Sequence, residues 1–163
     1  MGEGGPVTAL AGLTADGHGG LTLGGSRYLL IRPETLVGLQ KAVEQALGER
    51  APACIVAGGR AGGARATAVL DGRAEDRVRR LLRVGGEIGR GEFTLERLTA
   101  TELAVSVRHS PVALAYGPSA RPVCHLIRGV LESLVAAALG QSLEVLETAC
   151  VAMGAPACRF ETS

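Results

Sequence analysis

The feature that most constrains how this chain can fold is a group of three cysteines and one glutamate near its C-terminal end. The group consists of Cys124, Glu147, Cys150 and Cys158. Thiolates and one carboxylate are a suitable ligand set for a tetrahedral zinc ion. If one ion holds all four, the helix that begins near Cys124 must lie against the hairpin that carries the other three. The alternative is that the three thiols are small, partly buried apolar side chains, and spacing alone leaves both interpretations open.

The expected strands bear on which glutamate can reach the ion. Cys150 and Cys158 flank the final turn, so a hairpin brings their sulfurs together. Side chains alternate along a strand, so Glu147 can join Cys150 only if the strand bulges or ends between them, and Glu144 is the rival ligand. Four protein ligands imply a closed, structural site. Three thiolates and a carboxylate around zinc leave a formal charge of about minus two, which nearby amide donors or Arg159 would have to offset.

Two further groups near the expected site affect its chemistry. Cys124 is expected on the first turn of its helix, where the helix dipole lowers the pKa of a thiol. His125 is a poor ligand beside it, because adjacent side chains on a helix point about 100° apart. His18 and His109 are isolated in the sequence, so surface or capping roles are expected for them rather than catalysis.

Composition argues against several classes of protein. The chain has 163 residues, with 17 Lys plus Arg against 16 Asp plus Glu and only 2% aromatic residues, which does not favour a nucleic-acid surface. The longest apolar stretch, residues 130–140, is shorter than the roughly 20 residues that span a bilayer. The Gly-rich start lacks a basic segment followed by an apolar one. We therefore expect one cytoplasmic domain with reduced cysteines that binds neither nucleic acid by itself nor a membrane.

Hydrophobic periodicity predicts helices followed by strands, with one more helix before the last hairpin. Helices are expected over residues 33–48, 74–88 and 123–140. Strands are expected over residues 21–23, 28–31, 93–98, 103–109, 143–151 and 157–161. Three prolines, Pro111, Pro118 and Pro122, bound a segment that is expected to be a simple connection. The pattern is typical of an α+β fold.

A glycine cluster at positions 58, 59, 62 and 63 lies in the least regular region of the pattern. Residues 53–57 fit a buried strand, and residues 61–70 fit a helix. The cluster lacks both the Lys-Ser/Thr end of a phosphate-binding loop and the Gly-x-Gly-x-x-Gly register, so close helix packing on small residues is the better interpretation. For the whole chain we expect a flexible Gly-rich leader over residues 1–25 and a single ligand-binding domain over residues 26–163.

The C-terminal half carries a series of motifs that resembles a known family. The motifs are Val105-x-Val107-x-His109-Ser110-Pro111, Pro122-Val123-Cys124 at the start of a helix with Gly129, Glu147-x-x-Cys150, and Gly154-x-Pro156-x-Cys158-x-Phe160. They resemble the 4-vinyl reductase domain, and are most similar to the sensor domain of phenol- and toluene-responsive transcriptional activators. In that family the Cys, Glu, Cys, Cys set binds zinc. The resemblance therefore implies a zinc ion held by Cys124, Glu147, Cys150 and Cys158, and favours Glu147 over Glu144.

The resemblance also implies an architecture and an oligomeric state. The expected fold is an antiparallel sheet with helices packed on one side, similar to the small subunits of the vesicle-tethering transport protein particle, and dimeric through its N-terminal part. The chain departs from the aromatic-sensing members, because it has no Trp, two Tyr and two Phe, and carries aliphatic Val107 where a pocket aromatic is expected. Phenol itself is therefore not the expected ligand. The ATPase and helix-turn-helix modules of the activators do not fit within 163 residues.

The expected function is that of a small-molecule-binding regulatory or sensor domain with a structural zinc site. An apolar ligand would lie between the sheet and the long helix, against Phe93, Val105, Val107 and Val130. One alternative is an accessory protein or enzyme in vinyl reduction of a bacteriochlorophyll precursor. Catalysis is less expected, because the sequence has no nucleotide-binding fingerprint and no convincing acid/base pair. The other alternative is a dimeric scaffold protein.

Overall fold

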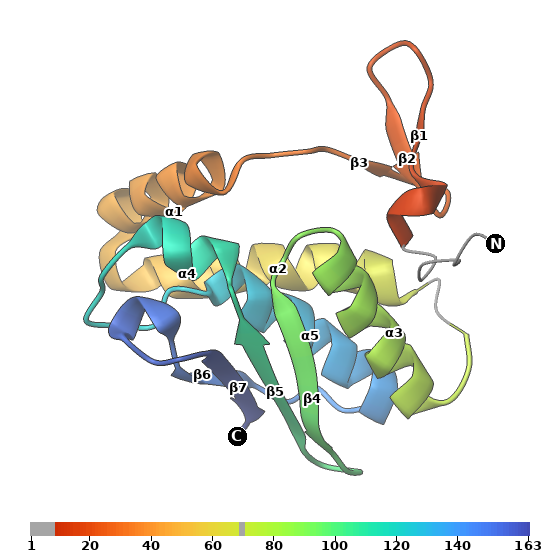
Figure 1. Cartoon of the computed structure of the whole chain (residues 1–163). Coiled ribbons are helices and arrows are strands. Elements are labelled where there is room, and N and C mark those ends of the chain that lie inside the picture. Colours follow the sequence, from red (N-terminus) through yellow and green to blue (C-terminus); the bar gives the residue numbers. More distant parts are fainter. Residues whose placement is uncertain (1–8, 69–70) are drawn as a thin grey trace, which may run out of the picture.

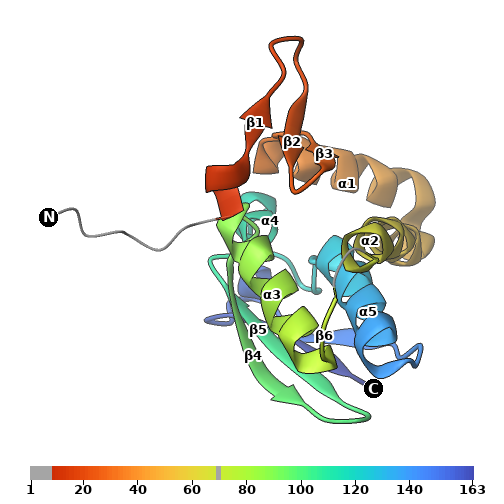
Figure 2. The ribbon, with the colours of Figure 1, turned by 90° about the vertical axis from the view of Figure 1, so that its right-hand side faces the viewer.

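The computed structural model describes residues 9–68 and 71–163. Its body is a four-stranded antiparallel sheet in the order β4-β5-β7-β6. The strands are β4 (Glu92–Leu98), β5 (Leu103–Arg108), β6 (Val145–Ala149) and β7 (Cys158–Thr162). Helices α3 (Ala74–Glu87) and α5 (His125–Leu139) cover one face of this sheet (Figures 1 and 2). The predicted α+β fold with helices on one side of an antiparallel sheet is confirmed.

The buried face of the sheet follows from the alternation of side chains along β5 and β7. Val105 pairs with Phe160 and Val107 with Cys158, and none of these four side chains is exposed to solvent. They pack against Leu131 of α5 within one hydrophobic cluster. Because alternate residues point to opposite faces, the residues between them face solvent, where charged side chains pair with one another across strands.

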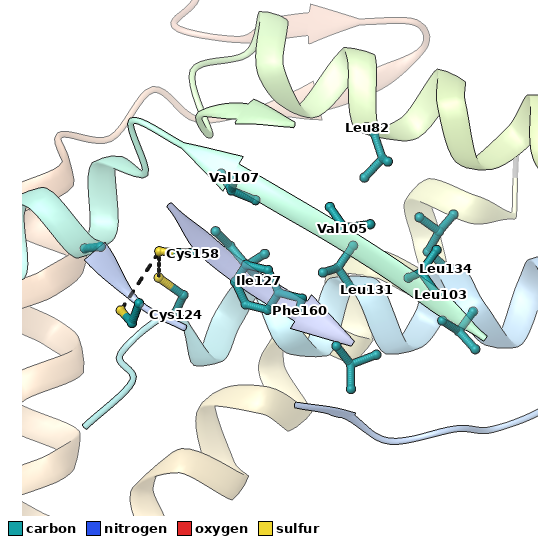
Figure 3. Close-up of a cluster of buried hydrophobic side chains, with 14 of the residues drawn as sticks. Leu82, Leu103, Val105, Val107, Cys124, Ile127, Leu131, Leu134, Cys158 and Phe160 are labelled. Atoms are coloured by element: carbon teal, nitrogen blue, oxygen red, sulfur yellow. Dashed lines mark hydrogen bonds between the residues drawn. The ribbon is translucent and has the colours of Figure 1, made fainter. Parts of the chain in front are cut away.

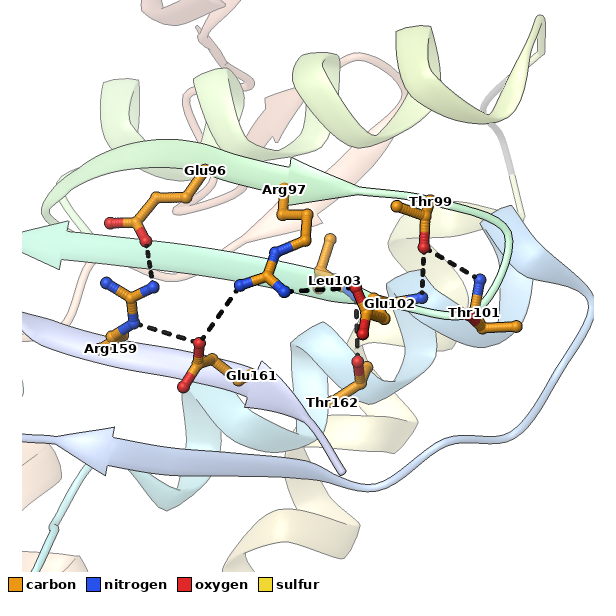
Figure 4. Close-up of polar contacts among 9 residues, drawn as sticks. All are labelled: Glu96, Arg97, Thr99, Thr101, Glu102, Leu103, Arg159, Glu161 and Thr162. Atoms are coloured by element: carbon orange, nitrogen blue, oxygen red, sulfur yellow. Dashed lines mark hydrogen bonds and ion pairs between the residues drawn. The ribbon is translucent and has the colours of Figure 1, made fainter.

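The opposite face of the sheet is covered by ion pairs rather than by helices (Figure 4). Arg159 contacts Glu96 of β4 at 2.9 Å and Glu161 at 3.2 Å, and Arg97 lies 3.9 Å from Glu161. Exposed pairs of this kind contribute little to stability. They keep this face polar, so the main hydrophobic cluster lies on the side of the sheet that the helices cover.

Helix α2 (Ala51–Thr67) follows α1 (Pro33–Leu47) and a short 3-10 turn, Gly48–Arg50. The alternative of a buried strand over residues 53–57 is wrong, because those residues lie inside α2. The physical reason is a close helix crossing: Gly59 packs on Gly129 of α5, and a side chain on either glycine would overlap the other helix. Small residues at this crossing let the two backbones approach closely, as the glycine cluster indicated.

The N-terminal part forms a second, smaller sheet that projects from the body (Figure 1). A 3-10 turn (Ala9–Gly12) precedes β1 (Thr14–Ala15), β2 (Leu21–Leu23) and β3 (Ser26–Tyr28), which are antiparallel in that order. The predicted strand at residues 21–23 is confirmed. The prediction of a strand over residues 28–31 is wrong. The observed strand β3 ends at Tyr28, and Leu29 and Leu30 are 79% and 73% exposed. Residues 1–8 of the predicted leader lie outside the described residues, and the boundary at residues 25 and 26 stays a prediction.

One helix was not anticipated from the sequence. The segment predicted to be a simple connection contains α4 (Pro111–Tyr116), with Pro111 in its first turn. The Ser110 hydroxyl accepts a hydrogen bond from the Ala113 backbone N–H at 3.3 Å and so caps this helix. A further 3-10 turn, Val151–Met153, lies between β6 and β7. Among the residues that the structure describes, no helix has the length and apolar character needed to cross a membrane.

Candidate metal centre and apolar cavity

The three cysteines and the glutamate named from the sequence meet in one place. One ligand atom from each of Cys124, Glu147, Cys150 and Cys158 lies within 4.8 Å of every other, and all four residues are buried. Figure 3 shows two of the cysteines, Cys124 and Cys158, at one end of the hydrophobic core, with their sulfurs facing each other. The predicted convergence of the start of the helix and the last hairpin is therefore observed.

A bulge in β6 brings the glutamate to the same side as the cysteines. Glu147 pairs with Phe160 of β7, and the next paired residue, Ala149, is opposite Arg159, so Thr148 is the extra residue. Such a bulge reverses the alternation of side chains. Strand β6 also ends at Ala149, one residue before Cys150. The condition set by the sequence for Glu147 to join Cys150 is thus met, whereas Glu144 is at the surface, 3.3 Å from Arg128.

The distances between sulfurs suit a tetrahedral ion. Ligand sulfurs at about 2.3 Å from zinc are separated from one another by about 3.8 Å in a tetrahedron. Here the sulfurs of Cys124 and Cys158 are 3.7 Å apart, and those of Cys158 and Cys150 are 3.9 Å apart. The side chains therefore already have nearly the spacing that a bound ion would require.

The carboxylate of Glu147 has the surroundings of a metal ligand. Its Oε2 accepts a hydrogen bond from the Cys124 backbone N–H at 2.9 Å, at the start of α5. Its Oε1 is buried without a hydrogen-bond partner among the described residues. Burial raises the pKa of Glu147 to about 8. A divalent cation between the sulfurs would give Oε1 a partner and favour the ionised carboxylate.

The thiols differ from one expectation. The pKa of Cys124 is raised rather than lowered, because its hydrogen bonds with the Cys150 and Cys158 thiols and its burial favour the neutral thiol. The same network lowers the pKa of Cys150, chiefly through hydrogen bonds from Cys124 and Cys158. Without an ion, three adjacent buried sulfurs do not all ionise, because each thiolate raises the pKa of the next.

Backbone amides, not an arginine, face the cluster. The Val151 N–H lies 3.4 Å from the sulfur of Cys158, in addition to the Cys124 amide that contacts Glu147. Arg159 is on the opposite face of the sheet, paired with Glu96 (Figure 4), so the suggestion that it offsets the charge of the site is wrong. His125 is buried but outside the ligand cluster, and burial lowers its pKa.

Helix α1 supports the loop that carries Cys124. The Gln40 amide donates a hydrogen bond to the Val123 carbonyl oxygen at 2.9 Å, and Gln40 is itself buried. One turn later, Glu44 accepts a 2.6 Å hydrogen bond from the Tyr116 hydroxyl of α4. We use the name metal corner for the candidate site formed by Cys124, Glu147, Cys150 and Cys158. The two hydrogen bonds tie α1 and α4 to it. Sequence patterns gave no sign of these contacts, because the partners are up to 83 residues apart.

A second feature, an apolar cavity of about 250 Å³, lies between α2, α3, α5 and β4. Of the four predicted ligand-contacting residues, Phe93 and Val130 line it. Val105 and Val107 do not line it, because both are fully buried in the hydrophobic core. The cavity-lining residues that were not predicted from the sequence are Tyr28, Gly58, Gly59, Gly62, Gly63, Ala66, Leu81, Leu82, Val84, Gly85, Ile88, Arg90, Leu126, Ile127 and Leu131.

The glycines of α2 serve the crossing and the cavity at once. Gly59 and Gly63 contact α5, whereas a Cβ atom on Gly58 or Gly62 would meet open space. All four glycines line the cavity, so one wall of it is bare helix backbone. The paired spacing of these glycines, with two on each face, was the only signal in the sequence that could have indicated this wall.

Comparisons with known proteins agree with the geometry. Residues 103–163 match the family model of the 4-vinyl reductase domain. This matched segment contains all four residues of the candidate metal centre. The resemblance to this domain that was inferred from the sequence is confirmed for this part of the chain.

A curated relative is the bacteriochlorophyll synthase 23 kDa chain of Cereibacter sphaeroides. It is 38% identical over 73 residues, which cover 45% of this chain and 34% of that protein. The match thus spans about a third of the relative's length.

Solved structures share the fold at low sequence identity. The phenol-responsive sensory domain of the transcription activator PoxR, determined with phenol, superposes with a TM-score of 0.81 at 22% identity, over 94% of this chain and 85% of that chain. A vinyl-4-reductase family protein from Methanocaldococcus jannaschii gives a TM-score of 0.57 at 14% identity, over 79% and 76% of the two chains. Subunit 3 of the trafficking protein particle complex from Naegleria fowleri, covalently bound to palmitic acid, gives 0.57 at 12% identity, over 80% and 93%.

Proposed function

We propose that residues 26–163 form a small-molecule-binding regulatory domain that takes an apolar ligand in the cavity between α2, α3, α5 and β4. The observation that carries this proposal is the cavity itself, since its walls are almost entirely aliphatic side chains and glycine backbone. Apolar concave sites with few polar groups are typical of small-molecule sites. The shared fold with a phenol-bound sensory domain supports the proposal.

The role that we propose for the metal is structural. Cys124, Glu147, Cys150 and Cys158 would hold one zinc ion, which joins the start of α5 to the β6-β7 hairpin. All four positions of a tetrahedral ion would then be filled by protein, leaving no place for a reacting water. Ligand binding on one side of α5 and metal binding at its start would both act on the same helix, which offers a path for a change in packing to reach the hairpin.

Cavity filling tests the proposed ligand site. Gly62→Leu places a side chain into the open space of the cavity, whereas Gly38→Leu makes the same change on α1, also in open space but away from the cavity. A thermal-shift screen with phenol, toluene, naphthalene and a tetrapyrrole should find a stabilising ligand for the wild type and for Gly38→Leu, but not for Gly62→Leu. No stabilisation of the wild type by any apolar compound would contradict the proposal.

A second candidate function follows from the curated relative. Its name places it in bacteriochlorophyll synthesis, so this chain would be an accessory protein or enzyme in vinyl reduction of a bacteriochlorophyll precursor. We favour an accessory role, which presents a pigment precursor to a separate enzyme. A chlorophyllide that binds at least 10-fold more tightly than simple aromatics would favour this candidate, and equal or weaker binding would argue against it.

The N-terminal part offers a surface for a second copy of the chain. Three consecutive apolar residues, Leu29, Leu30 and Ile31, are exposed to solvent, and Leu39 of α1 is 62% exposed. Clustered exposed apolar side chains are typical of protein interfaces. We propose a homodimer that covers this surface, either as the regulatory domain or as a dimeric scaffold. Sedimentation of the wild type should give a dimer, and Leu29→Asp with Leu30→Asp should give a monomer that keeps its metal.

A further inference from the structure

Two hollows of the molecule meet beside the end of α3. The apolar cavity described above adjoins a groove of about 500 Å³ that runs beneath the N-terminal sheet. The residues that line both are Tyr28, Ile88, Arg90, Leu126 and Ile127. A molecule that extends from the cavity into the groove must therefore pass these five residues.

The polar side chains that line this passage are few. Arg90 is the one charged residue that lines the cavity within the described ranges, and the Tyr28 hydroxyl is the one other polar side-chain group. Neither side chain has a hydrogen bond or an ion pair within residues 9–68 and 71–163. By contrast, Arg108 is held by Glu92 at 2.8 Å on the neighbouring strand β4. A guanidinium and a hydroxyl are thus available to a ligand at the mouth of an otherwise apolar site.

We propose that the ligand is an apolar carboxylic acid, with its hydrocarbon body in the cavity and its carboxylate bound by Arg90 and Tyr28. This inference rests on the proposed function, and adds to it the chemical class of the ligand. The guanidinium of arginine presents a planar pair of N–H donors that matches the two oxygens of a carboxylate. The Tyr28 hydroxyl supplies a further donor.

The surroundings favour an anion in one orientation. Arg90 and Tyr28 line both hollows, so a carboxylate bound by them lies in the passage while the hydrocarbon body extends into the cavity. The hydrocarbon body leaves water for a wall of Leu81, Leu82 and glycine backbone, which favours binding in proportion to the apolar area covered. An acid should therefore bind more tightly than a neutral molecule of the same shape, and a cation of that shape should bind most weakly.

Matched probes test the charge of the ligand. Two series of different shape are used: 2-naphthoic acid, 2-naphthamide and 2-naphthylmethylamine, and decanoic acid, decanamide and decylamine. Titration calorimetry at neutral pH compares them on wild type and Arg90→Gln. We expect the acid of at least one series to bind wild type about 10-fold more tightly than its amide, the gain of a charge-assisted hydrogen bond, and to lose that advantage in Arg90→Gln while the amide is unchanged.

The control is Arg83→Gln, which removes an exposed arginine of α3 that does not line the cavity. The acid should keep its advantage in this variant. If acid and amide bind alike to wild type, or if Arg90→Gln leaves the preference intact, the assignment to Arg90 is overturned while an apolar ligand site survives. If no probe binds wild type, both the ligand class and the proposed site are overturned.

Discussion

The metal corner and the apolar cavity lie on the same long helix and are built in opposite ways. At the start of α5, reactive side chains from three segments point inward and touch. Along the first two turns of α5, the cavity exists because α2 contributes glycines instead of side chains. Residue chemistry defines the first site, and missing side-chain volume defines the second. Substitutions that remove ligand atoms should therefore abolish metal binding at the metal corner, whereas substitutions that add side-chain volume should abolish ligand binding in the cavity.

The largest expected effect is loss of the metal ion. Cys150→Ser should reduce bound zinc from about one per chain to almost none, because serine is a poor zinc ligand. Loss of a structural metal is among the changes that cost more than about 4 kcal/mol of unfolding free energy. X-ray fluorescence of the purified protein and urea unfolding measure the two quantities.

The matched control for the metal ligand is the remaining cysteine. Cys54 is exposed on α2 and lies outside the cluster. Cys54→Ser should keep both the zinc content and the stability of the wild type. Equal zinc in the Cys150 and Cys54 variants would refute the ligand assignment.

Truncation of the two phenylalanines compares how tightly the core and the cavity wall are packed. Phe160 is fully buried on β7, and Phe160→Ala should cost about 4 kcal/mol. Phe93 lines the cavity and is only partly buried, so Phe93→Ala should cost about half as much. Chemical denaturation measures both. Equal losses would indicate that the cavity wall is as tightly packed as the core.

Two glycines test the crossing of α2 and α5 against the cavity wall. A Cβ atom on Gly129 would come within 2.7 Å of the Arg60 backbone nitrogen and 2.9 Å of the Gly59 Cα, so Gly129→Ala should cost about 3 kcal/mol. A Cβ atom on Gly58 meets nothing, so Gly58→Ala should stabilise α2 by about 0.5 to 1 kcal/mol. Thermal unfolding of the two variants should shift in opposite directions.

The smallest expected effect concerns the contacts that tie α1 to the metal corner. A hydrogen bond with Glu44 raises the pKa of Tyr116 from its usual 10.0 to about 12. The stability that this contact contributes should be complete below about pH 10 and should be lost as the pH rises toward 12. Ultraviolet titration of the wild type should show that Tyr116 ionises near pH 12, and Glu44→Gln should move this ionisation to lower pH. An unchanged titration would mean that the contact does not hold in solution.

The sequence was most informative where chemistry is carried by residue type. The four candidate metal ligands were named in advance, and the condition that β6 must bulge or end before Cys150 is met at Thr148. It was least informative where position depends on partners distant in the chain. Val105 and Val107 were assigned to the cavity because strand alternation shows which face is buried, but not which element covers it. Arg159 was named as an alternative to amide donors for offsetting the charge of the site, but it follows Cys158 on β7 and so lies on the opposite face of the sheet.

What the sequence indicated by itself is the group of candidate ligands, with Glu144 as the rival of Glu147, together with the long helix α5 and the two hairpins on either side of it, since local periodicity and reactive residue types are properties of short segments. Tertiary structure decided where empty space remains. The cavity arises from the packing of α2, α3 and α5 against β4, and Gly58 and Gly62 become its wall only because Gly59 and Gly63, on the same helix, are held against α5. A void has no sequence signature of its own, because it is defined by the side chains that fail to reach it.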